Sequence, residues 1–182
     1  VGSEMCIRDR TQRVQTQEKI EQLASQLSKY LSPQVYKSIF SGKKNVKIEA
    51  YRKKLTVFFS DIKGFTEITD RLEPEVLSSL LNSYLNEMSQ IALKHGGTID
   101  KFVGDAILIF FGDPETRGEK EDAKACALMA LEMRERMKHL RKIWEDQGIS
   151  NPLEIRIGIN TGFCNVGNFG SEDRLDYTII GG

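Results

Sequence analysis

Two aspartates, each placed where a strand or hairpin is expected to end, are the residues best suited to chemistry in this sequence. Asp61 follows the β-forming run 57–59, and Asp105 follows Gly104 between two further β-forming runs. If the strand before Asp61 lies beside that hairpin, the two carboxylates can converge. Two hard oxygen ligands at one point suit Mg²⁺ or Mn²⁺. A pair of such ions would lower the pKa of an attacking hydroxyl and neutralise a departing pyrophosphate, so the pattern favours two-metal phosphoryl transfer.

A glycine turn comes shortly after Asp61. Residues 55–66 read LTVFFSDIKGFT, in which Gly64 separates the strand from the start of a helical pattern. Backbone N–H groups at a helix start suit phosphate oxygens. A carboxylate beside such amides is what a metal-bound nucleoside triphosphate requires. Each aspartate alone is more often an ordinary turn residue, and only their shared context favours the metal site.

The elements that must position these residues alternate between helical and strand periodicity. The patterns predict a helix over 74–95, a hairpin of strands 98–103 and 106–111 around Gly104-Asp105, a helix over 119–147 and a strand over 153–160. A turn at Thr161-Gly162, a strand over 165–169 and a last strand from Tyr177 follow. This is an α+β order, with helices on one face of a mostly antiparallel sheet.

The first 53 residues are predicted to lie outside this domain. Residues 1–10 fit no pattern and are interpreted as an artefact of cloning or sequencing. Residues 11–31 form either a short coiled-coil seam or an amphipathic helix that packs on its own domain. A short helix from Ser32-Pro33 to Phe40 follows. A solvated linker then carries the basic residues Lys43, Lys44, Lys47, Arg52, Lys53 and Lys54.

Composition excludes several classes of protein. The chain has 182 residues, of which 40% are hydrophobic, and its 26 basic and 26 acidic residues give no net charge to attract nucleic acid or anionic membrane. No run approaches the roughly 18 apolar residues of a membrane span, and no secretory signal opens the chain, so we expect a cytoplasmic domain. Three widely spaced cysteines predict reduced thiols rather than a zinc or disulfide framework.

Four strings together resemble a known family over residues 54–182. FFSDIKGFT, HGGTIDKFVGDAILIFFGDP, IRIGINTGFCNVGNFGS and DYTIIGG occur in the order and spacing of the class III nucleotidyl cyclases, especially bacterial adenylate cyclases. The resemblance implies a ferredoxin-like, palm-like domain. It implies that Asp61, Asp105 and the Ile62 carbonyl bind two Mg²⁺ or Mn²⁺ ions per site. The terminal phosphates of the nucleotide would then be held by the amides of Gly64, Phe65 and Thr66.

The resemblance also implies two residues that contact the purine. The base-selecting position of the family lies four residues before the second aspartate and is Lys101 here, as in the adenine type, whereas glutamate marks guanylate cyclases. An ammonium group can donate to adenine N1 but cannot accept from guanine N1–H. Thr178 matches the second purine contact, where many members carry aspartate. Without the motif, Lys101 would be interpreted as an ordinary exposed strand lysine.

In such cyclases the site is shared between two chains. Asp61 and Asp105 of one subunit would face Lys101 and Thr178 of the other in a homodimer, and the amino-terminal helix would transmit a signal from an upstream sensor or membrane module. The transition-state asparagine and arginine of the family lie beyond the DYTIIGG position. The resemblance therefore predicts a domain incomplete at its C-terminal end, with reduced or no activity.

The favoured interpretation is an adenylate cyclase that converts ATP to 3′,5′-cyclic AMP and pyrophosphate in intracellular signal transduction. The alternatives are a guanylate cyclase and a non-catalytic nucleotide-binding or dimerisation module. A diguanylate cyclase is disfavoured, because the hairpin tip reads Val103-Gly104-Asp105 and not GGDEF.

Overall fold

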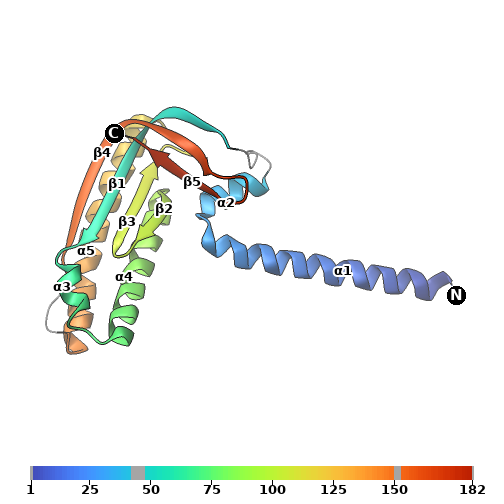
Figure 1. The fold of residues 1–182 in the computed structure, drawn as a ribbon, viewed down its shortest axis with the longest axis horizontal. Helices are drawn as coiled ribbons and strands as arrows, with labels where there is room; N and C mark the ends of the chain where they lie inside the picture. Colours follow the sequence, from blue (N-terminus) through green and yellow to red (C-terminus); the bar gives the residue numbers. More distant parts are fainter. Residues whose placement is uncertain (1, 42–47, 150–152, 182) are drawn as a thin grey trace.

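In the part of the chain that the structure describes, an antiparallel sheet of five strands packs against two long helices (Figure 1). The computed structural model describes residues 2–41, 48–149 and 153–181, with side chains from residue 14 onward. The elements are α1 (Gly2–Leu27), η1 (Ser28–Tyr30), α2 (Pro33–Phe40), β1 (Ala50–Ile62), α3 (Phe65–Thr69), α4 (Pro74–His95), β2 (Thr98–Val103), β3 (Ala106–Phe111), α5 (Glu119–Asp146), β4 (Ile155–Gly170) and β5 (Leu175–Ile180). The strand order is β2-β3-β1-β4-β5, which confirms the predicted α+β class.

The main core lies between the sheet and the pair α4 and α5. The apolar residues of α5 recur at a spacing of three and four, and the face that they form is buried from Cys126 through Met133 to Trp144. This face packs with Phe58 of β1 and Tyr84 of α4. A smaller cluster of Leu55, Phe110 and Val166 lies apart from it. The larger cluster holds the helices against the sheet and so keeps the ends of β1 and β3 together.

Strand β4 is longer than the sequence predicts. The turn predicted at Thr161-Gly162 and the separate strand over 165–169 are wrong, because one continuous strand runs from Ile155 to Gly170. Strand β1 pairs with β4 along its whole length, from Ala50 to Ile62. The backbone groups of Gly162 therefore lie within the ladder, opposite Leu55, and a turn there is not needed. At Gly167, a Cβ atom would lie 2.1 Å from the Glu49 carbonyl oxygen, so the close approach of the two chains requires glycine.

Strand β1 also begins earlier than predicted. Arg52, Lys53 and Lys54 were expected in a solvated linker, but they lie inside β1, which starts at Ala50 and therefore before the predicted domain boundary at residue 54. The continuation of β4 supplies their backbone partners. The remaining lysines of the predicted linker lie outside the described residues.

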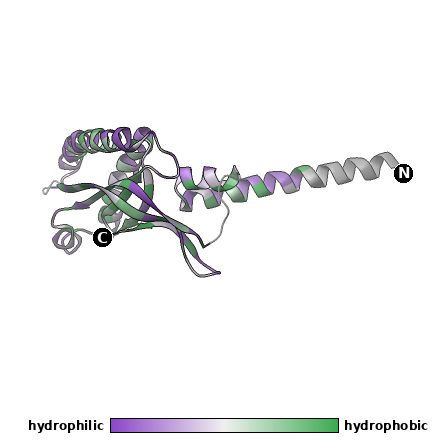
Figure 2. Ribbon diagram, turned by 90° about the horizontal axis from the view of Figure 1, so that it is seen from above, coloured by the Kyte–Doolittle hydropathy of each residue, from purple (hydrophilic) through white to green (hydrophobic). Residues whose placement is uncertain are grey.

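Helix α1 extends away from the sheet (Figure 2). It runs through residues 2–10, which were interpreted as an artefact, and that interpretation stays a prediction. The apolar positions of the predicted seam are more than half exposed, from 54% at Leu23 to 88% at Tyr30, so this face does not pack on its own domain. The short helix α2 begins as predicted, with Ser32 Oγ accepting from the Val35 N–H at 3.3 Å. None of the described helices combines the length and hydrophobicity of a membrane crossing.

The environments of two thiols lead to a first prediction. Cys126 is completely buried on the inner face of α5, and burial raises the pKa of its thiol to about 12. Cys164 of β4 is partly exposed, and burial raises the pKa of its thiol as well. In the folded protein at pH 8, iodoacetamide should alkylate Cys164 well before Cys126, as followed by peptide mass spectrometry. Both thiols should react alike in denaturant. Equal labelling of the two in the folded protein would contradict the burial of Cys126.

Candidate nucleotide and metal site

The two predicted metal-binding aspartates lie at the same end of the sheet. Asp61 comes one residue before the end of β1, and β1 pairs with β3 of the hairpin that turns at Gly104-Asp105. Asp105 Oδ2 accepts a hydrogen bond from the backbone N–H of Ile62 at 2.7 Å. This bond holds the hairpin tip against the end of β1, so Asp105 contacts the residue that follows Asp61. That the two carboxylates share a metal ion stays a prediction.

Arg156 of β4 is a member of this group that sequence reasoning missed. It lies opposite Asp61 in the ladder and donates from Nε to Oδ1 at 2.7 Å and from Nη2 to Oδ2 at 2.8 Å. The hydrogen bonds to Asp61 raise the pKa of Arg156. The arginine side chain is 66% exposed, so solvent screens the pair and its contribution to stability is small. The alternating pattern over 153–160 places Arg156 on the opposite face of the strand from Ile155 and Ile157. It does not indicate that Arg156 faces Asp61.

The residues around Asp61 fit a divalent metal ion. The carboxylates of Asp61 and Asp105 and the carbonyl of Ile62 are all hard oxygen donors, which Mg²⁺ and Mn²⁺ prefer. Among the described residues, no three histidine, cysteine or acidic side chains gather into a metal cluster. Two protein carboxylates are nevertheless enough for Mg²⁺, which usually keeps water and substrate phosphate oxygens as further ligands. Because the guanidinium of Arg156 is exposed, it can turn away from Asp61 at little cost.

The glycine turn has the predicted form. Gly64 adopts a left-handed conformation with φ of 68°, and space around it is open, so backbone freedom rather than crowding favours glycine there. Helix α3 begins directly after it, and its first hydrogen bonds run from the N–H groups of Glu67 and Ile68 to the Gly64 carbonyl. The amides of Phe65 and Thr66 precede these bonds. Their binding of phosphate stays a prediction.

The two predicted purine contacts lie in a second group, between β2 and β5. Thr178 of β5 is buried, and its Oγ1 donates to Oδ2 of Asp100 at 2.6 Å. The Nζ atom of Lys101 lies 3.7 Å from the other oxygen of Asp100. Strands β2 and β5 are the two edges of the sheet, so this contact requires the sheet to curl until its edges meet. Asp100 was missed by sequence reasoning, since no local pattern indicates that closure.

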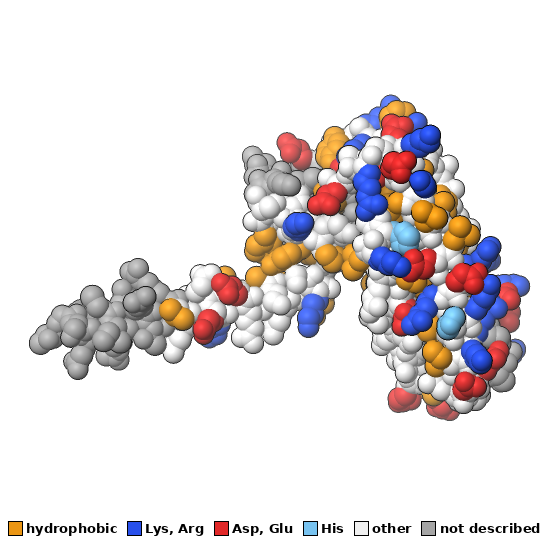
Figure 3. All heavy atoms as spheres, turned by 180° about the vertical axis from the view of Figure 1, so that it is seen from behind, with side chains coloured by type: hydrophobic (Ala, Val, Ile, Leu, Met, Phe, Trp, Pro, Cys, Tyr) orange, Lys and Arg blue, Asp and Glu red, His pale blue; other side chains and the backbone are white. Residues whose placement is uncertain are grey.

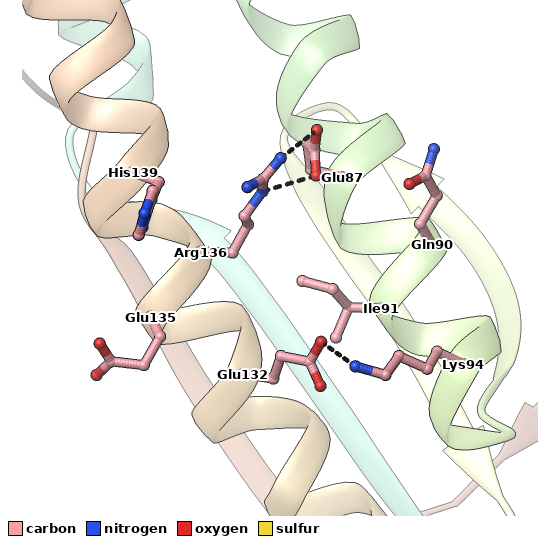
Figure 4. Close-up of a pocket in the computed structure, with 8 residues that line it drawn as sticks. All are labelled: Glu87, Gln90, Ile91, Lys94, Glu132, Glu135, Arg136 and His139. Atoms are coloured by element: carbon pink, nitrogen blue, oxygen red, sulfur yellow. Dashed lines mark hydrogen bonds and ion pairs between the residues drawn. The ribbon is translucent and has the colours of Figure 1, made fainter.

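The hollow between α4 and α5 lies apart from both groups. Arg136 of α5 donates twice to Glu87 of α4, at 2.8 and 2.9 Å, and Lys94 bonds to Glu132 at 2.7 Å (Figure 4). Side chains of both charges are interspersed over the helical face (Figure 3). Since these charges pair across the two helices, we assign the hollow to helix packing and not to substrate binding.

Comparison with known proteins agrees with this arrangement. The family model for the adenylate and guanylate cyclase catalytic domain matches residues 46–181. The terminal-differentiation-specific adenylate cyclase of Dictyostelium discoideum is 32% identical over 166 residues, which cover 90% of this chain and 8% of that protein. Adenylate cyclase 1 of Rhizobium meliloti is 35% identical over 134 residues, which cover 72% of this chain and 19% of that protein. The chain thus spans less than a fifth of the length of either relative.

Two solved structures share the fold. The adenylyl cyclase CyaB from P. aeruginosa is 66% identical with a TM-score of 0.72, over 74% of this chain and 68% of that chain. The guanylyl cyclase Cya2 is 38% identical with a TM-score of 0.69, over 74% of this chain and 66% of that chain. The family model covers most of the chain, and the solved cyclases match its sheet and helices. The chain therefore belongs to the class III nucleotidyl cyclases, the family of adenylate and guanylate cyclase catalytic domains.

Proposed function

We propose that this domain is the catalytic region of an adenylate cyclase. In the reaction, the ribose 3′-oxygen of ATP attacks the α-phosphorus, the bond from the α-phosphorus to the bridging oxygen breaks, and the products are 3′,5′-cyclic AMP, pyrophosphate and a proton. The observation that carries the choice of ATP is Lys101, an adenine-type residue that Asp100 links to Thr178. The 66% identity to an adenylyl cyclase supports the same choice.

The first group of residues would bind the metal ions and phosphates. Asp61, Asp105 and the Ile62 carbonyl would hold two Mg²⁺ or Mn²⁺ ions, and Asp105 already bonds to the end of β1. Bound ions supply charge neutralisation for the leaving pyrophosphate and lower the pKa of the attacking hydroxyl. The amides of Gly64, Phe65 and Thr66 would bind the terminal phosphates. Arg156 would pair with Asp61 when no metal is bound.

A homodimer would place the two groups in one site, with Asp61 and Asp105 of one chain facing Lys101 and Thr178 of the other. Large apolar side chains lie exposed near both groups, with 45% exposure at Phe59 of β1 and 60% at Val103 of β2. Such surfaces are typical of interfaces. The exposed seam of α1 would pair with its copy in the partner and carry a signal from an upstream sensor or membrane module, with the catalytic domain in the cytoplasm.

The experiment that tests this function uses the complete protein, including any encoded sequence that flanks this chain. Purified protein with Mn²⁺ and ATP should release cyclic AMP, measured by mass spectrometry, and EDTA should abolish the release. Product from GTP alone would show a guanylate cyclase instead. If no cyclic nucleotide forms while nucleotide still binds, the domain is a binding module. The same protein ended at Gly182 tests whether this chain by itself has reduced activity.

Reversing the charge of Lys101 should change the nucleotide preference. In K101E, a carboxylate replaces the group that donates to adenine N1 and can accept from guanine N1–H, so the ATP-to-GTP ratio of kcat/KM should fall about 30-fold. K124E is the matched control. Lys124 lies on the exposed surface of α5, where it pairs with Glu121, so the same reversal there should leave the ratio unchanged. An unchanged ratio in K101E would remove Lys101 from base selection.

A further inference from the structure

Asp100 occupies an irregular position in β2. The ladder with β3 pairs Ile99 with Ile109 and Lys101 with Leu108, so the register shifts at Asp100. A bulge of this kind re-aims the side chain of the extra residue. The side chain of Asp100 is 1% exposed, whereas that of the adjacent Lys101 is 42% exposed. The bulge thus turns a carboxylate inward, where burial is costly unless partners satisfy it.

The partners of Asp100 come mainly from β5. Thr178 Oγ1 donates to Oδ2 at 2.6 Å, the backbone N–H of Ile179 donates to the same carboxylate, and the Lys101 ammonium lies 3.7 Å from Oδ1. Burial raises the pKa of Asp100, and these three partners oppose that rise. An ionised carboxylate can only accept hydrogen bonds, so the hydroxyl proton of Thr178 must point toward it.

The direction of that proton decides what Thr178 can offer to a ligand. A threonine hydroxyl has one proton and two lone pairs. With the proton committed to Asp100, Oγ1 presents only lone pairs elsewhere. Adenine carries an amino donor at C6, whereas guanine carries an acceptor oxygen at the same ring position. An acceptor-only Oγ1 therefore suits adenine and repels guanine, while an uncommitted hydroxyl could serve either base.

We propose that Asp100 is a specificity-determining residue, which holds Thr178 as a hydrogen-bond acceptor and thereby makes this contact select adenine over guanine. Asp100 acts through Thr178 and does not contact the nucleotide itself, so it is a positioning residue. The inference rests on the proposed use of a purine nucleoside triphosphate at this site. Other family members carry aspartate at this position, and an ionised aspartate can only accept hydrogen bonds. With its proton held by Asp100, Thr178 would likewise only accept.

The test compares ATP and GTP in the complete protein with Mn²⁺. In D100N, the carboxamide can turn its NH₂ group toward Thr178, which then can donate to guanine O6. The ATP-to-GTP ratio of kcat/KM should fall about 10-fold, the size expected for one hydrogen bond gained by one base and lost by the other. Thermal unfolding checks that the variant is folded, and D100S, which also removes the charge, replaces D100N if the latter does not fold.

A double-mutant cycle separates positioning from a general structural effect. In a T178V background, the hydroxyl is gone, so D100N should cause no further change in the ratio. D173N is the matched control, because Asp173 is an exposed carboxylate in the turn between β4 and β5, and the ATP-to-GTP ratio of this variant should stay that of the wild type. An unchanged ratio in D100N, or an equal fall in the T178V background, would overturn the proposal.

Equilibrium binding distinguishes this inference from the proposed function. ATP and GTP are competed against a fluorescent purine nucleotide with Ca²⁺, so that affinity is measured without turnover. If the wild type makes no cyclic AMP but D100N still loses its binding preference for ATP, the proposed function fails and the role of Asp100 stands. If the wild type makes cyclic AMP and D100N keeps its preference in both assays, only the role of Asp100 fails.

Discussion

Replacing Asp61 with alanine should lower kcat for cyclic AMP formation by about 1,000-fold or more. The reason is that the metal ion that would neutralise the developing pyrophosphate loses a protein ligand. The same loss is expected for D105A, since Asp105 meets the end of β1 beside Asp61. Rates are measured with saturating Mn²⁺ and ATP. Increasing the Mn²⁺ concentration should recover little of the activity, because the remaining ligands are too few to fix the ion.

The folded state should survive the loss of Asp61. Arg156, which pairs with the Asp61 carboxylate, is 66% exposed, so D61A should change the free energy of unfolding by less than about 1 kcal/mol. D70A is the matched control: Asp70 is an exposed residue at the end of α3, and its loss should leave kcat unchanged. Near-normal activity in both D61A and D105A would exclude the proposed metal site.

The second large effect concerns stability. Asp113, two residues after the end of β3, is 2% exposed, and its carboxylate accepts from Lys53 at 3.0 Å and from the hydroxyls of Tyr51 and Tyr177. These partners come from β1 and β5, so one carboxylate connects three strands. Burial, followed by the hydrogen bond to Asp113, raises the pKa of Tyr51 to about 12, so the phenol keeps its proton to donate.

D113A should therefore lower the free energy of unfolding by about 3 kcal/mol, because it removes a buried charged acceptor from several donors at once. Lys53 is partly exposed and can turn to water, which limits the loss. Urea unfolding measures the change. E119A is the matched control, since Glu119 pairs with the neighbouring Lys54 at 2.9 Å in an exposed ion pair and should contribute less than about 1 kcal/mol. Equal losses in the two variants would contradict the structural role of Asp113.

Much of the fold is predictable from the sequence, because the relevant signals are local. The three-and-four spacing from Cys126 to Trp144 predicts which face of α5 is buried, and that face does pack on the sheet. Gly104-Asp105 predicts the hairpin, and Gly64 predicts the turn into α3. Two predictions about the strands were wrong, the start of β1 and the break in β4. Neither the start of β1 at Ala50 nor the continuity of β4 through Gly162 can be derived without knowing that each strand supplies the other's hydrogen-bond partners.

The candidate site divides in the same way. By itself, the sequence determined that Asp61 and Asp105 end β-forming runs and that Lys101 and Thr178 stand in a cyclase pattern. Only the tertiary structure decided that Asp105 bonds to the end of β1, that Arg156 faces Asp61 and that Asp100 joins Lys101 to Thr178. The physical reason is that these contacts depend on strand register, on a bulge and on the meeting of the two sheet edges. Each of these is set by hydrogen bonds between segments far apart in the chain, which no local pattern of side chains encodes.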